Sequence, residues 1–297
     1  MVLYLSESDI AKVLTYEQLI PAMERALAEF SAGKVIQPVR QILTIEEGKR
    51  FLGVMPAVTP DGMGAKLVTY YPKNEGTQHH THMATISLFD PETGEPLACM
   101  DGRLITEMRT AAVSAAVTKY AALPDAKVLT LIGSGVQAEA HLHALRQVCN
   151  FKEVRIWSRT AENARKFADK HLVRAMELEQ AVRGADVIVT ATNSQQAIVK
   201  GAWLKEGAHL NAVGSPRSSA RELDDDVMRG VVIADSREAV LKESGDVILS
   251  HAKIFAEAGE IFSGAKVIPR GQTTVFKSVG LAVEDIATAR LVYDMLT

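Results

Sequence analysis

The sequence predicts an α/β protein that combines a doubly wound parallel sheet with a smaller α+β domain. Two features of the 297-residue chain lead to this prediction. Short β-rich runs separated by turn sequences fill much of the first third, whereas buried apolar runs alternate with helical segments in the rest. The length is typical of two domains, each large enough to bury its own core.

The smaller domain is predicted to begin with a helix and to continue as a sheet. Thr15 is the predicted N-cap of a helix that extends to Phe30 and ends near Gly33. Strand-like runs then alternate with turn residues, and they cover residues 39–45, 50–54, 64–71, 84–89 and 97–100. We expect these runs to form an antiparallel sheet or an open barrel.

A strongly helical stretch over residues 104–121 leads into the larger domain. Its buried strands are predicted at residues 127–132, 154–157, 187–191, 208–213 and 231–234. A last helical stretch over residues 283–296 is expected to return to the first domain. The predicted domains are therefore residues 1–106 with 283–297, and residues 107–282.

A glycine motif directly follows the first strand of the larger domain. In Gly133-x-Gly135-x-x-Ala138, the first glycine permits a tight turn, the second lets a pyrophosphate approach the backbone, and the alanine lets the next helix pack closely. The N-terminus of that helix favours the negative charge of a phosphate. A plain strand–turn–helix is the alternative. We predict a Rossmann-type dinucleotide site whose loop consists of Gly133, Ser134, Gly135, Val136 and Gln137.

The end of the next strand indicates which dinucleotide is bound. A site for NAD usually has an acidic residue there, whereas an arginine accommodates the 2′-phosphate of NADP. This chain has Ser158, Arg159 and Thr160 at that point, with Asn163 in the following turn. Arg159 could instead be an ordinary solvated loop residue. We predict NADPH as the cofactor, because arginine is always charged and binds phosphate oxygens in a forked geometry.

Composition narrows the class of protein. Hydrophobic residues make up 47% and charged residues 23% of a chain whose formal net charge is −3. These values are ordinary for a globular protein, and they give no reason to expect nucleic acid or an anionic membrane as a partner. No apolar stretch approaches the ~20 residues of a membrane span, and the N-terminus does not resemble a signal peptide. Because Cys99 and Cys149 form no CxxC pair, we expect a cytoplasmic protein.

Three cations of the first domain and its border lie in apolar surroundings. They are Arg40, Lys66 and Arg109. A cation in such a setting is costly to desolvate unless an anion meets it, and a substrate carboxylate would be such an anion. The alternatives are surface positions or internal ion pairs.

Other polar groups give weaker indications. His79, His80 and His82 lie close together but have no acidic partner at a recognisable ligand spacing, so we expect no metal site. His82 alone is a candidate proton donor or binding contact, and an ordinary loop histidine is the alternative. Residues 242–246 (KESGD) are predicted to be a solvated helix end, and a position facing the cleft is the alternative.

Segments spread over nearly the whole chain match a known family. They are residues 37–40 (QPVR), 52–57 (LGVMPA), 66–69 (KLVT), 100–102 (MDG), 109–115 (RTAAVSA), 152–159 (KEVRIWSR), 211–214 (NAVG) and 274–285 (TVFKSVGLAVED). With these segments the sequence resembles the ornithine cyclodeaminase/mu-crystallin family, and most closely its mu-crystallin branch. That branch acts as an NADPH-dependent ketimine reductase and, in vertebrates, binds thyroid hormone.

The resemblance implies roles for particular residues. Arg40, Lys66 and Arg109 match the family's ligands for the substrate carboxylate. The first domain would bind substrate and form a homodimer, and the second would bind NADPH. Lys277, Ser278 and Gly280 would lie near the nicotinamide end of the cofactor. Asn211, Ala212 and Val213 would border the cleft.

One departure from the family pattern separates its activities. Ornithine cyclodeaminases and related alanine dehydrogenases place an aspartate two residues after the glycine that ends the 208–213 strand, where this chain has Pro216. The missing carboxylate weakens the prediction of cyclodeamination, and the mu-crystallin branch also lacks it.

The resulting functional prediction is hydride transfer from NADPH to the C=N carbon of a cyclic ketimine carboxylate, or of an imine formed from a 2-oxo acid and an amine. Lys66 is the first candidate for the acid that protonates the nitrogen, and His82 is the second. An NADPH-linked amino-acid dehydrogenase or cyclodeaminase-like enzyme is one alternative. A protein that binds NADPH and an iodothyronine-like aromatic carboxylate without turnover is the other.

Overall fold

The computed structural model describes residues 2–47 and 49–297. The chain divides into two compact units. The first contains the described residues up to Arg109 together with Gly280–Thr297, and the second contains Thr110–Val279. The boundary falls within helix α3 (Arg103–Ala121).

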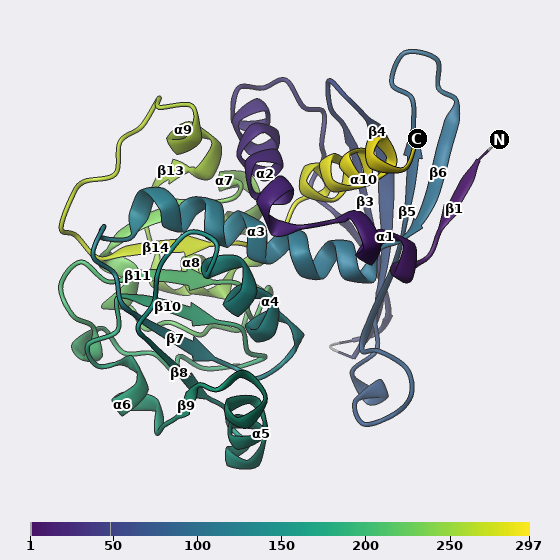
Figure 1. Ribbon diagram of the computed structural model, residues 1–297. Helices are drawn as coiled ribbons and strands as arrows, with labels where there is room; N and C mark the ends of the chain where they lie inside the picture. Colours follow the sequence, from purple (N-terminus) through teal and green to yellow (C-terminus); the bar gives the residue numbers. More distant parts are fainter. Residues whose placement is uncertain (1, 48) are drawn as a thin grey trace. The chain divides into compact units, whose positions relative to one another are not determined.

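The first unit is built on a six-stranded sheet with the spatial order β1-β6-β5-β4-β3-β2 (Figure 1). Its strands are β1 (Leu3–Leu5), β2 (Gln41–Glu46), β3 (Arg50–Val58), β4 (Met63–Tyr70), β5 (His82–Phe89) and β6 (Pro96–Asp101). Strands β2 to β6 pair antiparallel, which confirms the predicted antiparallel sheet, and β1 pairs parallel with β6. The sheet is open, because β1 and β2 form its two edges.

Helices cover one face of this sheet. The unit contains α1 (Glu7–Val13), α2 (Tyr16–Ser31), the 3-10 turn η1 (Pro72–Asn74) and α10 (Ala282–Leu296). Helix α10 packs against α2 and across β3, β4 and β5 (Figure 1). Gly64 of β4 makes this close approach possible, because a Cβ there would overlap the Ser87 carbonyl oxygen and lie 2.9 Å from Ile286 of α10. Successive side chains of a strand alternate between faces, so Lys66 is buried while Leu67 is exposed.

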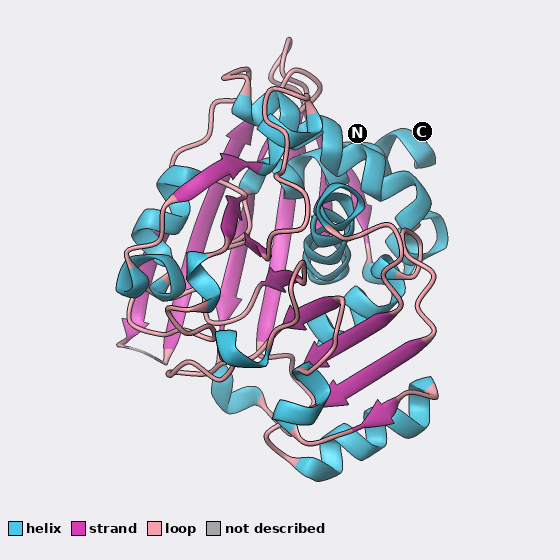
Figure 2. Cartoon of the chain, turned by 90° about the vertical axis from the view of Figure 1, so that its left-hand side faces the viewer, coloured by secondary structure: helices cyan, strands magenta, loops and turns pink. Residues whose placement is uncertain are grey.

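The second unit contains an eight-stranded sheet with the order β13-β12-β14-β11-β10-β7-β8-β9. Every strand pairing in it is parallel, and Figure 2 colours the strands magenta and the helices between them cyan. The strands are β7 (Val128–Ile132), β8 (Glu153–Trp157), β9 (Arg174–Ala175), β10 (Val187–Thr190), β11 (His209–Ala212), β12 (Val231–Ala234), β13 (Ile254–Glu257) and β14 (Thr274–Lys277). The central strands β10, β11 and β14 are buried along their whole length, as expected of strands covered on both faces. The predicted α/β fold with a doubly wound parallel sheet is confirmed.

The remaining helices connect these strands. They are α4 (Val136–Leu145), α5 (Ala161–His171), α6 (Leu178–Val182), α7 (Arg237–Glu243), α8 (Gly245–Ser250) and α9 (Ala258–Phe262), with 3-10 turns η2 (Gly201–Trp203) and η3 (Val227–Arg229).

The prediction of a solvated helix end over residues 242–246 was wrong for its second half. Helix α7 ends at Glu243, and the Ser244 hydroxyl accepts a hydrogen bond from Val247 N to begin α8. Asp246 is fully buried there.

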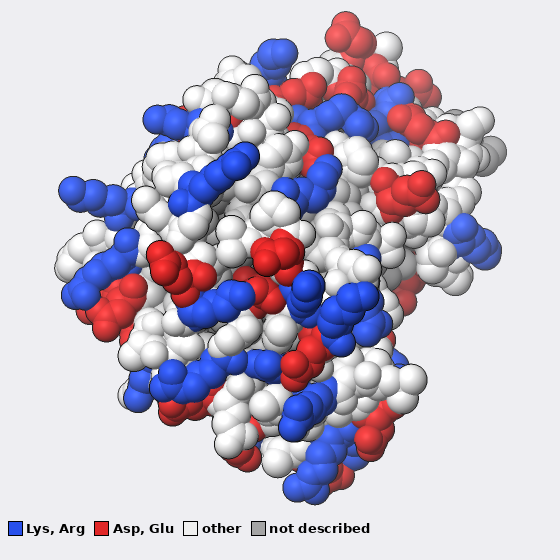
Figure 3. All heavy atoms as spheres, turned by 60° about the vertical axis from the view of Figure 1, so that its left-hand side comes forward, with Lys and Arg blue, Asp and Glu red and all other residues white. Residues whose placement is uncertain are grey.

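The surface carries charges of both signs. On the face presented in Figure 3, basic and acidic side chains are interspersed. Within residues 2–47 and 49–297, no helix is both long and apolar enough to cross a membrane.

Candidate functional site

The three cations predicted from the sequence come together in the first unit. Lys66 projects from the helix-covered face of β4, Arg109 lies on α3, and Arg40 directly precedes β2. Arg40 donates a hydrogen bond to the Gly280 carbonyl, and Gly280 also lies against the Arg109 guanidinium, which brings the two arginines together. Lys66 and Arg109 are 1% and 4% exposed. The structure therefore brings together residues that lie 26 to 69 positions apart in the sequence.

Two carboxylates at the beginning of α10 pair with this cluster. Asp285 Oδ2 lies 2.5 Å from Lys66 Nζ, and Asp285 Oδ1 accepts a hydrogen bond of 3.0 Å from Arg109 Nε. Glu284 Oε2 accepts a hydrogen bond of 2.5 Å from Arg109 Nη1. Both acidic side chains are fully buried. The sequence analysis missed their role, although both residues lie in the 274–285 segment that carried the family resemblance.

The electrostatic balance of this cluster changes the acidity of Lys66. Burial, opposed by Asp285 and reinforced by Arg109 and Arg40, lowers the pKa of Lys66 to about 8. An ammonium with that pKa releases its proton far more readily than an ordinary lysine. The two guanidinium groups beside this ammonium are donors suited to an anionic group.

Gly280 shapes the space around Arg109. Its φ of +79° lies in the left-handed region, and a Cβ there would lie 2.5 Å from Arg109 Nη1. The Gly280 carbonyl oxygen also accepts a hydrogen bond of 2.6 Å from Arg40 Nη2. Glycine at this position lets the backbone pass between the two guanidinium groups.

His82 begins β5 and is exposed. Its ring packs against Tyr70, with 4.6 Å between ring centroids, and its Nδ1 shares a 3.3 Å hydrogen bond with the Thr81 hydroxyl. Partial desolvation and the positive charge of Lys66 lower the pKa of His82. The imidazole is therefore mostly neutral at neutral pH, so His82 carries a proton that it could donate less often than Lys66 does. His79 and His80 are exposed.

The predicted phosphate-binding loop joins β7 to α4 in the second unit. Gly133 has a φ of +113°, and a Cβ there would overlap the Ala191 carbonyl oxygen, so only glycine fits. A Cβ at Gly135 would meet nothing within 4 Å, which leaves open space beside the backbone. Gly135 is the N-cap of α4, whose first residues are Val136 and Gln137. The loop thus offers free backbone and a helix N-terminus to an anion.

The end of β8 lies beside this loop. The Ser134 hydroxyl donates a 2.9 Å hydrogen bond to the Ser158 hydroxyl, and Gly133 N donates to the Trp157 carbonyl. Beyond Ser158, the predicted site residues Arg159, Thr160 and Asn163 are exposed. The residues predicted for the phosphate loop and for the 2′-phosphate therefore belong to one region of the second unit.

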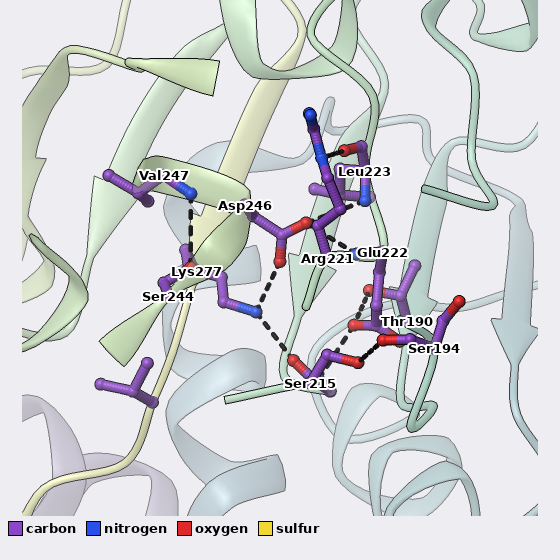
Figure 4. A network of polar contacts seen from close by, with 12 residues as sticks. Thr190, Ser194, Ser215, Arg221, Glu222, Leu223, Ser244, Asp246, Val247 and Lys277 are labelled. Carbon is purple, nitrogen blue, oxygen red and sulfur yellow. Dashed lines mark hydrogen bonds and ion pairs between the residues drawn. The ribbon is translucent and has the colours of Figure 1, made fainter. Parts of the chain in front are cut away.

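Lys277 ends β14 inside a buried network (Figure 4). Its ammonium lies 2.9 Å from Asp246 Oδ2 and donates a 2.9 Å hydrogen bond to the Gly214 carbonyl. Glu222 accepts hydrogen bonds from Thr190, Thr192 and Gly214, and burial raises the pKa of Glu222. Lys277 thereby ties the end of β14 to the backbone that follows β11.

The other residues predicted near the cofactor lie at the same ends of β11 and β14. The Asn211 side chain donates a 3.0 Å hydrogen bond to Thr118, and Val213 follows β11 in a half-buried position. Ser278 donates a 2.9 Å hydrogen bond to Asp235. Asp235, Glu222 and Asp246 were not identified from the sequence, because their buried partners lie far away along the chain. A separate hollow lined by Lys205, Asp226 and Arg229, among others, contains none of the predicted site residues.

Comparisons with known proteins agree on one family. The model of the ornithine cyclodeaminase/mu-crystallin family matches residues 2–297. Ketimine reductase mu-crystallin of Macropus fuliginosus is 48% identical, over 98% of this chain and 96% of the relative. The structure of Thermococcus litoralis Δ1-pyrroline-2-carboxylate reductase in complex with NADH and L-proline has a TM-score of 0.93 and 38% identity, covering 99% and 97% of the two chains. An archaeal alanine dehydrogenase dimer with bound NAD has a TM-score of 0.92 and 32% identity, covering 99% and 95%.

Proposed function

Because the chain belongs to the ornithine cyclodeaminase/mu-crystallin family, we propose that it is an NADPH-dependent imine reductase. Its substrates are cyclic ketimine carboxylates of the Δ1-piperideine-2-carboxylate or Δ1-pyrroline-2-carboxylate type, or imines of 2-oxo acids with amines. The names of the relatives support this reaction class, since they describe reduction of ketimines and of pyrroline-2-carboxylate.

The observation that carries the proposal is the cluster that half-buried Arg40 forms with the buried residues Lys66, Arg109, Asp285 and Glu284. Arg40 and Arg109 supply the planar donors that bind a carboxylate in a defined orientation. Holding the substrate in one orientation contributes several kcal/mol to catalysis. Lys66, with its pKa lowered to about 8, holds a proton that it can give to the imine nitrogen.

Nicotinamide dinucleotide is the cofactor class that fits the second unit, and its reduced form supplies the hydride. The open space at Gly135 and the N-terminus of α4 suit a pyrophosphate. We assign NADPH rather than NADH because Arg159 is exposed at the end of β8 and no carboxylate occupies residues 158–160. The solved relatives named above contain NADH and NAD, so this assignment depends on residues of this chain.

The charge of the reacting group explains why an acid is needed. A protonated imine carries a positive charge that it loses as it accepts hydride, so protonation of the nitrogen favours the reaction. Lys66 Nζ is the donor that the geometry favours, because Asp285, which is itself held by Arg109, fixes the position of its ammonium. Arg40 and Arg109 hold the carboxylate during this step.

A homodimer formed through the first unit is part of the proposal. Leu43, Leu67 and Met83 are 55%, 46% and 39% exposed. Strand register places Leu43 opposite Leu52, Leu52 opposite Thr69, and Thr69 opposite Met83, so these positions share the face that α10 does not cover. An exposed apolar sheet face of this kind suits a second copy of the chain, and the archaeal alanine dehydrogenase is described as a dimer.

The test follows NADPH absorbance with Δ1-piperideine-2-carboxylate at mildly acidic to neutral pH, with NADH as the matched control. Faster oxidation of NADPH than of NADH supports both the reaction and the assignment of Arg159. Turnover with NADH alone would refute the cofactor assignment. If NADPH binds but neither this imine nor pyruvate with methylamine oxidises it, the reductase proposal is refuted. Oxidation of alanine or ammonia release from ornithine would then identify an amino-acid enzyme, whereas binding without any turnover would identify a carrier of an aromatic carboxylate.

A further inference from the structure

Three potential metal ligands meet on α4 and α5 of the second unit, and none of them is among the residues assigned to the phosphates. Glu139 and His143 lie four residues apart on α4, so they project from the same face of that helix. His171 is the last residue of α5. One ligand atom from each residue lies within 4.8 Å of the other two.

The separations approach those of a coordination sphere. His171 Nε2 lies 3.6 Å from Glu139 Oε1, and His143 Nε2 lies 4.0 Å from the same oxygen. Ligand atoms at ~2.0–2.2 Å from a tetrahedral zinc ion are roughly 3.4 Å apart. Small rotamer adjustments therefore suffice to close the set, and His143 can make them because its side chain is 49% exposed.

His171 provides an independent indication of a ligand. Its side chain is only 7% exposed, and its Nε2 is buried without a hydrogen-bond partner among the described residues. The ring is held in place by Phe167, with 4.4 Å between ring centroids, and by the edge of His143. A buried imidazole nitrogen without a partner is costly. Here that nitrogen is directed toward the Glu139 carboxylate, where a bound cation would satisfy it.

Lys170 occupies part of the same region. Its ammonium donates hydrogen bonds of 2.7 and 2.9 Å to the two Glu139 oxygens. The Lys170 side chain is 62% exposed, so it can move into solvent at little cost when a cation replaces it. The ammonium shows that Glu139 already attracts a positive charge at this point.

We propose that Glu139, His143 and His171 form a binding site for a divalent transition-metal ion of the zinc type. Two imidazoles and one carboxylate are ligands that zinc accepts, and three protein ligands leave a coordination position for water. The ion joins α4, which begins at the phosphate-binding loop, to the end of α5. This inference goes beyond the reductase activity and does not depend on it.

The first experiment measures binding of ZnCl₂ to the chelator-treated full chain by calorimetry, and records the visible spectrum of the Co²⁺ form. We expect one equivalent of metal and the intense bands of tetrahedral cobalt without a thiolate charge-transfer band. His143→Gln and His171→Gln should each weaken binding at least about 100-fold, since even loss of an outer-shell partner costs ~10–100-fold. A His79→Gln/His80→Gln variant is the matched control, and its affinity should be unchanged.

A second variant tests the ligand set from the opposite direction. Lys170→Gln removes the competing ammonium from Glu139 and should tighten zinc binding about 10-fold. Lys166→Gln is its control, because Lys166 lies on the same helix and pairs with Glu162 instead. Any of three results would overturn the proposal. They are the absence of stoichiometric binding, binding that survives both His143→Gln and His171→Gln, and equal affinities of the two lysine variants. Since His143 is exposed, its variant should fold even if the His171 variant does not.

Discussion

Asp285→Asn tests the role of the cation cluster more directly than removal of a cation does. Asp285 pairs with both Lys66 and Arg109, at 2.5 and 3.0 Å, and its negative charge is what raises the Lys66 pKa against the effect of burial. Asparagine keeps the size of the side chain and an acceptor oxygen. The substitution therefore removes the charge while leaving much of the packing of α10 intact.

The expected size of the effect follows from the pKa of Lys66. An opposite charge at this range typically shifts a pKa by ~1–3 units. If the pKa falls from about 8 by about 2 units, the protonated fraction at pH ~7 falls from about 90% to about 10%. Because a general acid works in its protonated form, activity declines as pH rises through the pKa of that acid. Asp285→Asn should therefore shift this decline to lower pH and reduce activity about 10-fold at neutral pH.

The assay is a pH profile of kcat/KM for imine reduction, with NADPH affinity and circular dichroism as checks on the second unit and on folding. Glu284→Gln is the matched control, because Glu284 pairs with Arg109 and is not among the charges that act strongly on Lys66. We expect the control to raise the KM for the imine without moving the profile. Lys66 can lose its proton when its partner is neutralised, so the Asp285 variant should remain folded.

The reasoning would be refuted if the pH profile of Asp285→Asn kept its position while the rate fell equally at every pH. It would show that the group titrating in the profile is not Lys66. A shift of the same size in Glu284→Gln would also contradict it, because the effect would then reflect the total charge of the cluster.

Three further substitutions follow from the same structure. Lys66→Met should reduce turnover at least about 100-fold while NADPH fluorescence titration shows unchanged binding, and retained turnover would remove Lys66 from the mechanism. Arg159→Gln should lower kcat/KM for NADPH by about 10–100-fold and leave that for NADH unchanged, and an equal loss for both cofactors would contradict the 2′-phosphate assignment. Gly280→Ala should lower the free energy of unfolding by about 1–2 kcal/mol, because the φ of +79° is unfavourable for alanine. The added Cβ should also displace Arg109 and so raise the KM for the imine. Unchanged thermal unfolding and unchanged steady-state kinetics would contradict this prediction.

The parts of the fold that could be predicted from the sequence are those governed by local patterns. Periodicity and turn residues located β2 and β4 to β8 closely, because each run is long or is bounded by strong turn signals. Strand β3 extends four residues beyond the predicted run 50–54. Strand β1 has three residues, too few for a pattern to develop. Strand β14 was not predicted, because its last residue is the charged Lys277, although the whole strand is buried.

The sequence predicted the cations of the site but not the carboxylates that pair with them. Arg40, Lys66 and Arg109 are conspicuous because each interrupts an apolar segment, but nothing local identifies what neutralises them. The partner carboxylate of Asp285 lies 176 residues from Arg109 and is brought there by α10. The same limitation applies to the proposed metal ligands. The four-residue spacing of Glu139 and His143 is visible in the sequence, whereas the position of His171 depends on how α5 packs.

Two fully buried lysines, Lys66 and Lys277, show why charge balance separates a reactive residue from a structural one. Lys277 has an aspartate of its own, Asp246, and a backbone carbonyl, so its charge is matched and its position is fixed. Lys66 shares Asp285 with Arg109, and Arg40 adds a further positive charge. Burial, only partly offset by Asp285 and reinforced by the two arginines, lowers the pKa of Lys66 to about 8. A carboxylate bound by those arginines would lie beside an ammonium that has become a better acid, which is the combination that reduction of an imine carboxylate requires.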